Sequence, residues 1–372
     1  MKKIKIMTVF GTRPEAIKMA PLIKEIEKQQ TDFESIVVVT AQHREMLDQV
    51  LTFFEIEPDY DLNIMKAGQT IAGITSSILL KLESIISETQ PDIILVHGDT
   101  TTTFATSLSA FYQQVKIGHV EAGLRTWNKY SPFPEEMNRQ LTDVLSDLYF
   151  APTEETKTNL LNEKIPAEKI FMTGNTVIDA LNYTIKEDYQ PTNLKMQSPE
   201  NKLILLTMHR RENQGQPMVN VFKALRRVLD ERQDVEIVYP VHLSPKVQSL
   251  AKEYLEGHER IHLIPPLDLV EFHNMLNQAY FVMSDSGGIQ EEAPSLEKPV
   301  LVLRDTTERP EGVAAGTLKL IGTEEAEVYD EMLVLLTDQQ MYRKMAQAKN
   351  PYGDGKASQR ILEAIKSSFK PE

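Results

Sequence analysis

Residues 280–293 read YFVMSDSGGIQEEA, and the prediction of the fold starts from this change of pattern. An apolar run ends in Ser-Asp-Ser, two glycines follow, and two glutamates stand where a helix is expected to begin. A buried strand, a tight turn and a helix in this order form one step of a parallel α/β sheet. Glycines before a helix are typical of a phosphate-binding turn, whereas paired carboxylates are typical of an acid–base site. The stretch alone supports either interpretation.

The same step recurs along the whole chain, because short apolar runs without alternation predict strands that are buried on both faces. In the first half these runs lie at 4–10, 35–40, 92–97, 115–120, 147–151 and 169–173. In the second half they lie at 203–209, 235–241, 260–264, 280–284, 299–303 and 317–321. Helical patterns separate the runs. We therefore predict an α/β fold of two doubly wound, Rossmann-like domains that face a central cleft.

The boundary between the two domains is expected near a polar segment at 182–202 that contains two prolines. We predict an N-terminal domain at 1–175 and a C-terminal domain at 176–356. Residues 357–372 are predicted to form a C-terminal helix that packs back on the first domain. One apolar stripe supports this helix, formed by Ile361, Leu362, Ile365 and Phe369.

Composition limits the classes of function. The 372 residues, with 41% hydrophobic and 25% charged side chains, are ordinary for a soluble globular protein of about two domains. A formal net charge of −14 argues against nucleic acid or an anionic membrane as a partner. The absence of cysteine excludes disulfides and thiolate metal sites. Neither a signal peptide nor a run of about 18 apolar residues is found, so we predict a cytoplasmic enzyme.

Polar side chains follow several predicted strands, where doubly wound folds bind their ligands. Arg13 and Lys18 stand near a helix N-terminus that favours anions. Asp99 and Glu121 follow two neighbouring strands, and carboxylates placed in this way can couple so that one stays protonated as an acid. The alternative is a set of ordinary helix caps and solvated ion pairs.

The second half adds cations and histidines at its strand ends. His209 precedes two arginines, His242 follows the next strand, and Arg304 and Arg309 follow the fifth. The string HERIH at 258–262 fits a zinc-protease pattern, but it reads as a strand rather than a helix, so we predict no metal site. These residues indicate acid–base chemistry on a phosphorylated or nucleotide-linked substrate, without singling out the reaction.

Eight strings taken together resemble the non-hydrolysing UDP-N-acetylglucosamine 2-epimerase family. In order over about residues 6–320, they are FGTRPEAIK, HGDTTT, VEAGLRT, PFPEEMNR, GNTVIDA, HRREN, SDSGGIQEEA and TERPEG. The resemblance implies a GT-B architecture, a homodimer and no metal or redox cofactor. It also implies reversible C2 epimerisation of UDP-GlcNAc to UDP-ManNAc, by elimination of UDP to 2-acetamidoglucal and re-addition, to supply a cell-surface polysaccharide. The alternatives are a GT-B glycosyltransferase, a hydrolysing epimerase and a non-catalytic UDP-sugar sensor.

The resemblance also implies roles for individual residues. The catalytic set is Asp99, Glu121 and Glu135 for proton transfer, with His209 at the leaving phosphate. The substrate-binding set is Arg13, Lys18, Asp99, Glu121, His209, Phe272, Ser286, Gly287, Gly288, Glu292 and Arg309. Within this set, residues 286–288 match a diphosphate loop, Glu292 a ribose-binding carboxylate and Phe272 a neighbour of the uracil. The opening stretch is thereby divided between the phosphates and the ribose.

A second, activating UDP-GlcNAc site is implied in the same way. The residues that match it are Gln42, His43, Gln69, Glu136, Arg210 and His242. Some members of the family carry an arginine immediately before the residue that matches Gln69, whereas this chain has Gly68. One charged contact to the activator is therefore expected to be missing.

Overall fold

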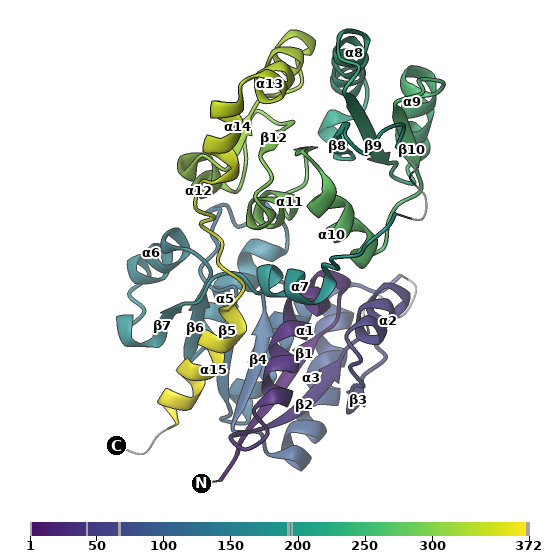
Figure 1. The fold of residues 1–372 in the computed structure, drawn as a ribbon. Coiled ribbons are helices and arrows are strands. Elements are labelled where there is room, and N and C mark those ends of the chain that lie inside the picture. Colours follow the sequence, from purple (N-terminus) through teal and green to yellow (C-terminus); the bar gives the residue numbers. More distant parts are fainter. Residues whose placement is uncertain (1, 42–43, 66–67, 192–193, 195, 370–372) are drawn as a thin grey trace. The chain divides into compact units, whose positions relative to one another are not determined.

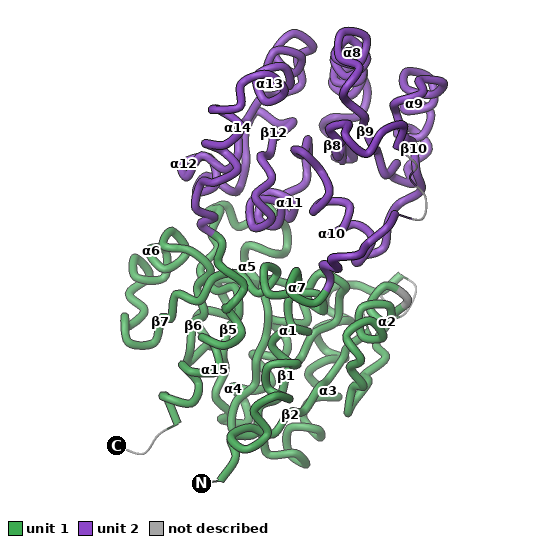
Figure 2. Tube along the Cα trace, viewed as in Figure 1, with its two compact units in different colours: residues 1–183, 352–372 green, residues 184–351 purple. Residues whose placement is uncertain are grey.

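The protein forms two compact units in the computed structural model, which describes residues 2–41, 44–65, 68–191, 194 and 196–369. Unit 1 comprises the chain up to Tyr183 together with the residues from Tyr352 onward, and unit 2 comprises Thr184–Pro351 (Figure 2). Each unit contains a parallel sheet between helices, so the predicted fold class of two doubly wound α/β domains is confirmed.

Unit 1 is built on a seven-stranded sheet with the order β3-β2-β1-β4-β5-β6-β7 (Figure 1). Its strands are β1 (Ile4–Phe10), β2 (Phe33–Val39), β3 (Tyr60–Asp61), β4 (Ile93–His97), β5 (Lys116–Val120), β6 (Leu148–Ala151) and β7 (Ile170–Met172). Its helices are α1 (Arg13–Lys28), α2 (Arg44–Phe53), α3 (Ile71–Thr89), α4 (Thr101–Tyr112), α5 (Glu135–Leu145), α6 (Glu154–Asn162), η1 (Ala167–Lys169), α7 (Thr176–Thr184, which ends at the boundary) and α15 (Ala357–Ser368). The direction in which strands are added reverses between β1 and β4, and this is where such sheets bind ligands.

Unit 2 is built on a six-stranded sheet with the order β10-β9-β8-β11-β12-β13. Its strands are β8 (Lys202–Thr207), β9 (Val235–Pro240), β10 (Ile261–Ile264), β11 (Phe281–Ser284), β12 (Val300–Val302) and β13 (Leu318–Leu320). Its helices are η2 (Arg211–Asn213), α8 (Gln216–Glu231), α9 (Pro245–Leu255), α10 (Leu269–Gln278), α11 (Ile289–Glu292), η3 (Ala293–Leu296), α12 (Pro310–Ala315), α13 (Glu325–Thr337) and α14 (Gln339–Ala346). Here the reversal lies between β8 and β11.

Every strand predicted from an apolar run is present, with ends that differ by at most two residues. The lack of alternation is explained by β1, in which Met7, Val9 and Phe10 have no exposed surface because helices cover both faces of the sheet. The two-residue strand β3 was not predicted. It has too few residues to show a pattern, and it pairs with β2 through Tyr60 and Asp61.

The C-terminal helix α15 belongs to unit 1 and packs against α1. The carboxylate of Asp179 in α7 accepts hydrogen bonds from the backbone N–H groups of Ala357 (3.1 Å) and Ser358 (2.8 Å), at the first turn of α15. This contact joins α7 to the returning chain. The units accordingly divide after Tyr183, whereas the boundary drawn from the sequence falls at residue 175, before α7. Among the described residues, none of the helices has the length and apolarity to cross a membrane.

Candidate active site

The turn between β1 and α1 is held by a buried carboxylate. Thr12 caps α1, and Glu15 accepts hydrogen bonds from the backbone N–H groups of Gly11 (3.0 Å) and Thr12 (2.7 Å). The other oxygen of Glu15 accepts from the hydroxyl of Thr100 (2.6 Å), which belongs to the turn after β4. A Cβ on Gly11 would lie 1.9 Å from the hydroxyl oxygen of Thr40, so only glycine fits there. The turns after β1 and β4 are thus fixed to each other.

Glu121 follows β5, and the structure brings it together with Lys18 of α1. The Lys18 ammonium forms an ion pair with Glu121 Oε2, which also accepts a hydrogen bond from Asn175 Nδ2 (2.8 Å). His97 Nε2 lies 3.6 Å from the same oxygen. Burial alone would raise the pKa of Glu121, but the charge of Lys18 and then that of His97 hold it well below its usual value. Glu121 is therefore an ionised carboxylate whose basicity depends on where Lys18 is placed.

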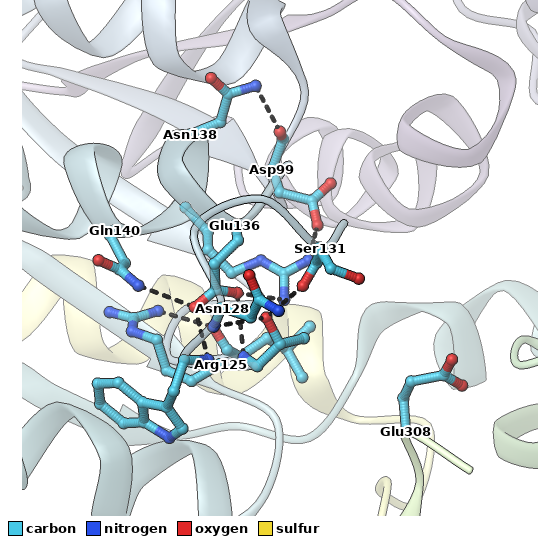
Figure 3. A network of polar contacts seen from close by, with 12 residues as sticks. Asp99, Arg125, Asn128, Ser131, Glu136, Asn138, Gln140 and Glu308 are labelled. Carbon is cyan, nitrogen blue, oxygen red and sulfur yellow. Dashed lines mark hydrogen bonds and ion pairs between the residues drawn. The ribbon is translucent and has the colours of Figure 1, made fainter. Parts of the chain in front are cut away.

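Asp99, at the end of β4, is held by two side chains of α5. Arg139 Nη2 lies 2.5 Å from Asp99 Oδ2, and Asn138 Nδ2 donates to the backbone carbonyl of Asp99 at 3.0 Å. Figure 3 shows the amide of Asn138 pointing at Asp99. A helix that holds both the backbone and the carboxylate of one residue fixes the orientation of that carboxylate.

Glu135 and Glu136 open α5, and they occupy different environments. Glu136 is fully buried, and its oxygens accept hydrogen bonds from the backbone N–H groups of Thr126 (3.0 Å) and Trp127 (3.1 Å) (Figure 3). Burial alone would raise the pKa of Glu136, but the backbone N–H of Thr126 and then the amide of Gln140 lower it. Glu136 therefore shapes the loop that precedes α5, whereas Glu135 is half-buried at the first residue of the helix.

In unit 2 a buried carboxylate at the end of β11 positions His209, which follows β8. Asp285 has no exposed surface, and it accepts hydrogen bonds from the backbone N–H groups of His209 (3.0 Å) and Arg210 (2.9 Å). Asn213 Nδ2 donates to the same carboxylate at 3.0 Å. Asp285 Oδ1 also lies 3.5 Å from His209 Nδ1. The sequence analysis did not select Asp285, although its place between two serines at a strand end was a usable signal.

The rings of His209 and His242 stack, with centroids 5.4 Å apart and an angle of 13° between their planes. His242 Nδ1 accepts a hydrogen bond from the backbone N–H of Ser244 at 3.1 Å. This contact occupies Nδ1 of His242 as an acceptor and leaves Nε2 for other partners. The stacking fixes the plane of the His209 ring beside that of His242.

The turn from β11 to α11 contains residues 286–288. Ser284 Oγ accepts a hydrogen bond from the backbone N–H of Ser286 at 2.9 Å, and Gln290 Nε2 donates to the Ser286 carbonyl at 3.1 Å. Gly287 and Gly288 complete the turn into the helix. The short helix α11 continues directly into η3, so the helical stretch after the turn runs from Ile289 to Leu296.

The two glutamates of this helix have separate partners. Glu291 is buried and forms an ion pair with Arg309, which was predicted to bind substrate. Glu292 Oε2 lies 3.6 Å from Nε2 of the buried His273, and the ring of His273 is next to that of Phe272 on α10. The structure thus brings Phe272 and Glu292 to one side of unit 2 through His273, which the sequence analysis did not identify.

The residues predicted to bind an activator fall in both units. Gln69 Nε2 donates to the carbonyl of Ile64 at 2.6 Å, and Glu136 is engaged as described above. Arg210 Nη1 lies 3.7 Å from Glu308, and His242 stacks on His209. Gln42 and His43 lie outside the described residues. The structure therefore places two of the six residues in each unit.

The histidine pair of the string HERIH is not on a helix. His258 lies in the loop between α9 and β10, and His262 is on β10, where its Nε2 lies 2.7 Å from the buried carboxylate of Glu236. Across the described residues, no group of three or more His, Asp and Glu side chains is arranged to hold a metal ion. His262 therefore has a structural partner.

Comparison with known proteins gives consistent matches over nearly the full length. The sequence model described as UDP-N-acetylglucosamine 2-epimerase matches residues 24–366. The UDP-N-acetylglucosamine 2-epimerase of Bacillus subtilis is 61% identical over 365 residues, which cover 98% of this chain and 96% of the relative. A crystal structure described as a putative UDP-N-acetylglucosamine 2-epimerase from Listeria monocytogenes has a TM-score of 0.95 and 58% identity, and the match covers 99% of this chain and 97% of the other. The UDP-GlcNAc 2-epimerase from Neisseria meningitidis, solved with UDP-GlcNAc bound, has a TM-score of 0.85 and 50% identity over 98% and 100% of the two chains.

Proposed function

The chain belongs to the UDP-N-acetylglucosamine 2-epimerase family, and we propose that it interconverts UDP-GlcNAc and UDP-ManNAc by elimination and re-addition of UDP. It is an enzyme of the isomerase class. The single observation that supports the mechanism best is the buried cluster at the end of β5. There, the carboxylate of Glu121 is kept ionised by Lys18, a residue predicted to hold the substrate.

The reaction requires a base, an acid and stabilisation of the leaving group. A base removes the proton at C2, the electron pair of that C–H bond forms the C1–C2 double bond, and the C1–O bond breaks with its electrons on UDP. Re-addition of UDP to C1 then returns a proton to the opposite face of C2. Because the two faces need proton transfer from two directions, more than one carboxylate is required. We propose that Asp99, Glu121 and Glu135 supply these transfers.

The leaving group is proposed to bind in unit 2. A diphosphate that departs gains negative charge, and His209 with Asp285 behind it offers a positioned N–H donor for that charge. Residues 286–288 are proposed to contact the diphosphate and Glu292 the ribose. Phe272 is proposed to lie near the uracil. Lys18 and Arg13 of unit 1 complete the proposed binding set.

Incubation with UDP-GlcNAc alone in D2O, followed by proton NMR, tests the function. We expect UDP-ManNAc to form and the C2 proton signal to disappear from both nucleotide-sugars, because the proton exchanges with solvent. Free ManNAc would indicate the hydrolysing reaction instead. Unchanged substrate that turns over only with a sugar acceptor would indicate a glycosyltransferase, and unchanged substrate under all conditions a sensor.

We also propose that UDP-GlcNAc activates the enzyme at a second site, through residues that include Gln69 and Arg210. With pure UDP-ManNAc as the only substrate, the reaction is expected to start slowly and to accelerate as UDP-GlcNAc accumulates. A trace of added UDP-GlcNAc should remove the lag, because an effector changes the behaviour of a second, coupled site. Full initial speed without added UDP-GlcNAc would refute this proposal.

A homodimer is the assembly that we propose, and three adjacent helices of unit 1 support it. α3 packs on α4 and α4 on α5, and each of the three carries a large exposed apolar side chain: Leu80 is 73%, Phe111 55% and Val144 76% exposed. If these side chains lie together in one apolar patch, such a patch would mark an interface between proteins. The supply of a cell-surface polysaccharide and a cytoplasmic location stay predictions.

Charge on this face is expected to separate the subunits. The double substitution Phe111→Glu with Val144→Glu should shift the mass measured by light scattering from dimer to monomer, because two carboxylates per subunit would be buried in the interface. Leu161→Glu on α6 is the matched control, since Leu161 is an exposed apolar residue (40%) on a different helix. A wild-type protein that is monomeric at all concentrations would contradict the proposal.

A further inference from the structure

His119, on β5, lies between two hydrogen-bond acceptors and has no exposed surface. Its Nδ1 is 2.5 Å from Oδ1 of Asp143, and its Nε2 is 2.7 Å from the carbonyl oxygen of Gly98. A neutral imidazole has one N–H group and one acceptor nitrogen, so a neutral ring would set a lone pair against one of these oxygens. A ring with protons on both nitrogens satisfies both contacts.

We propose that His119 is a doubly protonated positioning residue that sets the geometry of the two strand-end carboxylates, Asp99 and Glu121. The inference rests on the proposed function in so far as these carboxylates carry the proton transfers. The protonation of the ring is a separate claim that can be measured without any substrate.

A proton on Asp143 does not explain the contact with His119, because the guanidinium of Arg125 stabilises the ionised carboxylate. Arg125 Nη2 lies 2.6 Å and the backbone N–H of Gly123 3.3 Å from Oδ2 of Asp143. Burial alone would raise the pKa of Asp143, but the charges of His119 and Arg125 lower it. Asp143 is therefore ionised and acts only as an acceptor.

Arg125 contributes to the charge of this cluster. It pairs with Asp143 and also with Glu163, through Nε at 2.7 Å, and the Arg125 side chain has no exposed surface. Glu163 is 25% exposed, so water also solvates this carboxylate. Tyr149 donates its hydroxyl proton to the backbone carbonyl of Asp143 and brings no charge. An imidazolium at position 119 is compatible with these surroundings, because it faces the buried carboxylate of Asp143.

The contacts of His119 reach both proposed catalytic carboxylates. The carbonyl that it binds belongs to Gly98, directly before Asp99, and the N–H of Gly98 donates to the carbonyl of Val120, directly before Glu121. Glu121 has a φ of 65°, a left-handed conformation that non-glycine residues rarely adopt. Hydrogen bonds on both sides hold Glu121 in this conformation. The N–H of Gly98 donates to the carbonyl of Val120, and the N–H of Gly123 donates to the carboxylate of Asp143. Loss of the His119 contacts would therefore remove the support of both turns, the one that carries Glu121 and the one that carries Asp99.

The protonation state is tested by NMR on the full-length wild-type protein labelled with ¹⁵N in its histidine rings. The His119 signals are assigned by their disappearance in His119→Gln. We expect both ring nitrogens of His119 to carry protons under the conditions of the activity assay, because each faces an acceptor oxygen. A single ring proton under those conditions would overturn the proposal whatever the enzyme's activity.

The positioning role is tested with His119→Gln against Tyr149→Phe. The glutamine side chain can donate to Asp143 or to the Gly98 carbonyl, but not to both. The phenylalanine removes the Tyr149 hydroxyl from the same cluster and leaves the turns of Asp99 and Glu121 unchanged. For His119→Gln we expect kcat to fall about 10²-fold, the usual cost of a small misplacement, with KM and calorimetric affinity for UDP within a few-fold of wild type. Tyr149→Phe should lower the melting temperature but keep kcat.

Two outcomes would show that His119 only stabilises the fold. One is a folded His119→Gln enzyme with wild-type kcat, and the other is a loss of kcat in Tyr149→Phe as large as that in His119→Gln. If the wild-type enzyme itself fails to convert UDP-GlcNAc, the proposed function fails. The NMR result then still decides the state of the ring.

Discussion

Replacement of Glu121 by glutamine is expected to lower kcat by about 10²–10⁴-fold, the usual contribution of a general acid or base. Glutamine has nearly the same shape, and it can still meet Asn175, but it cannot accept a proton at C2. It also removes the negative charge with which the Lys18 ammonium pairs in the wild-type protein. The measurement is the rate of C2 proton exchange in D2O, together with kcat for UDP-ManNAc formation. Affinity for UDP should change little, since its proposed contacts are mainly in unit 2.

The pH dependence adds a second test of Glu121. Because Lys18 and His97 hold the pKa of this carboxyl well below its ordinary value, the folded free enzyme keeps Glu121 ionised through the range in which carboxylates normally titrate. The ion pair thus stabilises the fold above the ordinary carboxyl pKa of about 4.3, and that contribution is lost as pH falls through the lowered value.

The control for Glu121→Gln is Glu168→Gln, which removes one negative charge at an exposed position in η1. If Glu121→Gln exchanges the C2 proton with D2O at the wild-type rate, another group removes that proton.

Lys18 connects binding to catalysis in this scheme. In the structure its charge is directed at Glu121, which favours the ionised carboxylate and weakens it as a base. A substrate diphosphate offers Lys18 a stronger anion. If Lys18 moves to the phosphate, Glu121 loses the charge that depresses its pKa and becomes a better base only when substrate is present.

The strands could be predicted from the sequence because each is a short run buried on both faces, and the residues after them could be read as candidate ligands. The partners of the supporting carboxylates could not be predicted, even where the position of the carboxylate itself was a signal. Asp285 holds the backbone of His209, 76 residues earlier, and Glu15 accepts from Thr100, 85 residues later. In the sequence each looks like an ordinary helix cap or turn residue, since nothing local specifies a partner that only the fold supplies.

Adjacent identical residues show the same limit. The sequence does not say which glutamate of a pair faces inward, because neighbouring residues of a helix point in different directions and either could face the core. In α5 the buried member is Glu136, which holds the preceding loop, and in α11 it is Glu291, which binds Arg309. Glu135 and Glu292 remain for the roles proposed above.

Replacement of His209 by asparagine is expected to lower kcat by about 10²–10³-fold, the usual cost of removing one donor that stabilises developing charge. Asparagine leaves the backbone N–H that donates to Asp285 in place, so the turn after β8 should keep its conformation. It removes the ring that stacks on His242 and that Asp285 faces at 3.5 Å. Steady-state kinetics in both directions measure the effect, which should be equal because the same bond to UDP breaks and forms.

The matched control is His258→Asn in the same unit. His258 lies in the loop between α9 and β10, at the amino end of a strand, whereas ligands of doubly wound sheets bind at the carboxyl ends. We expect this variant to keep the wild-type kcat. If His209 acts on the leaving UDP, a substrate analogue whose leaving group departs as a weaker base should recover part of the rate lost in His209→Asn, because less charge then needs stabilising. A deficit of the same size with both substrates would instead place His209 in proton transfer at C2, together with the carboxylates of unit 1.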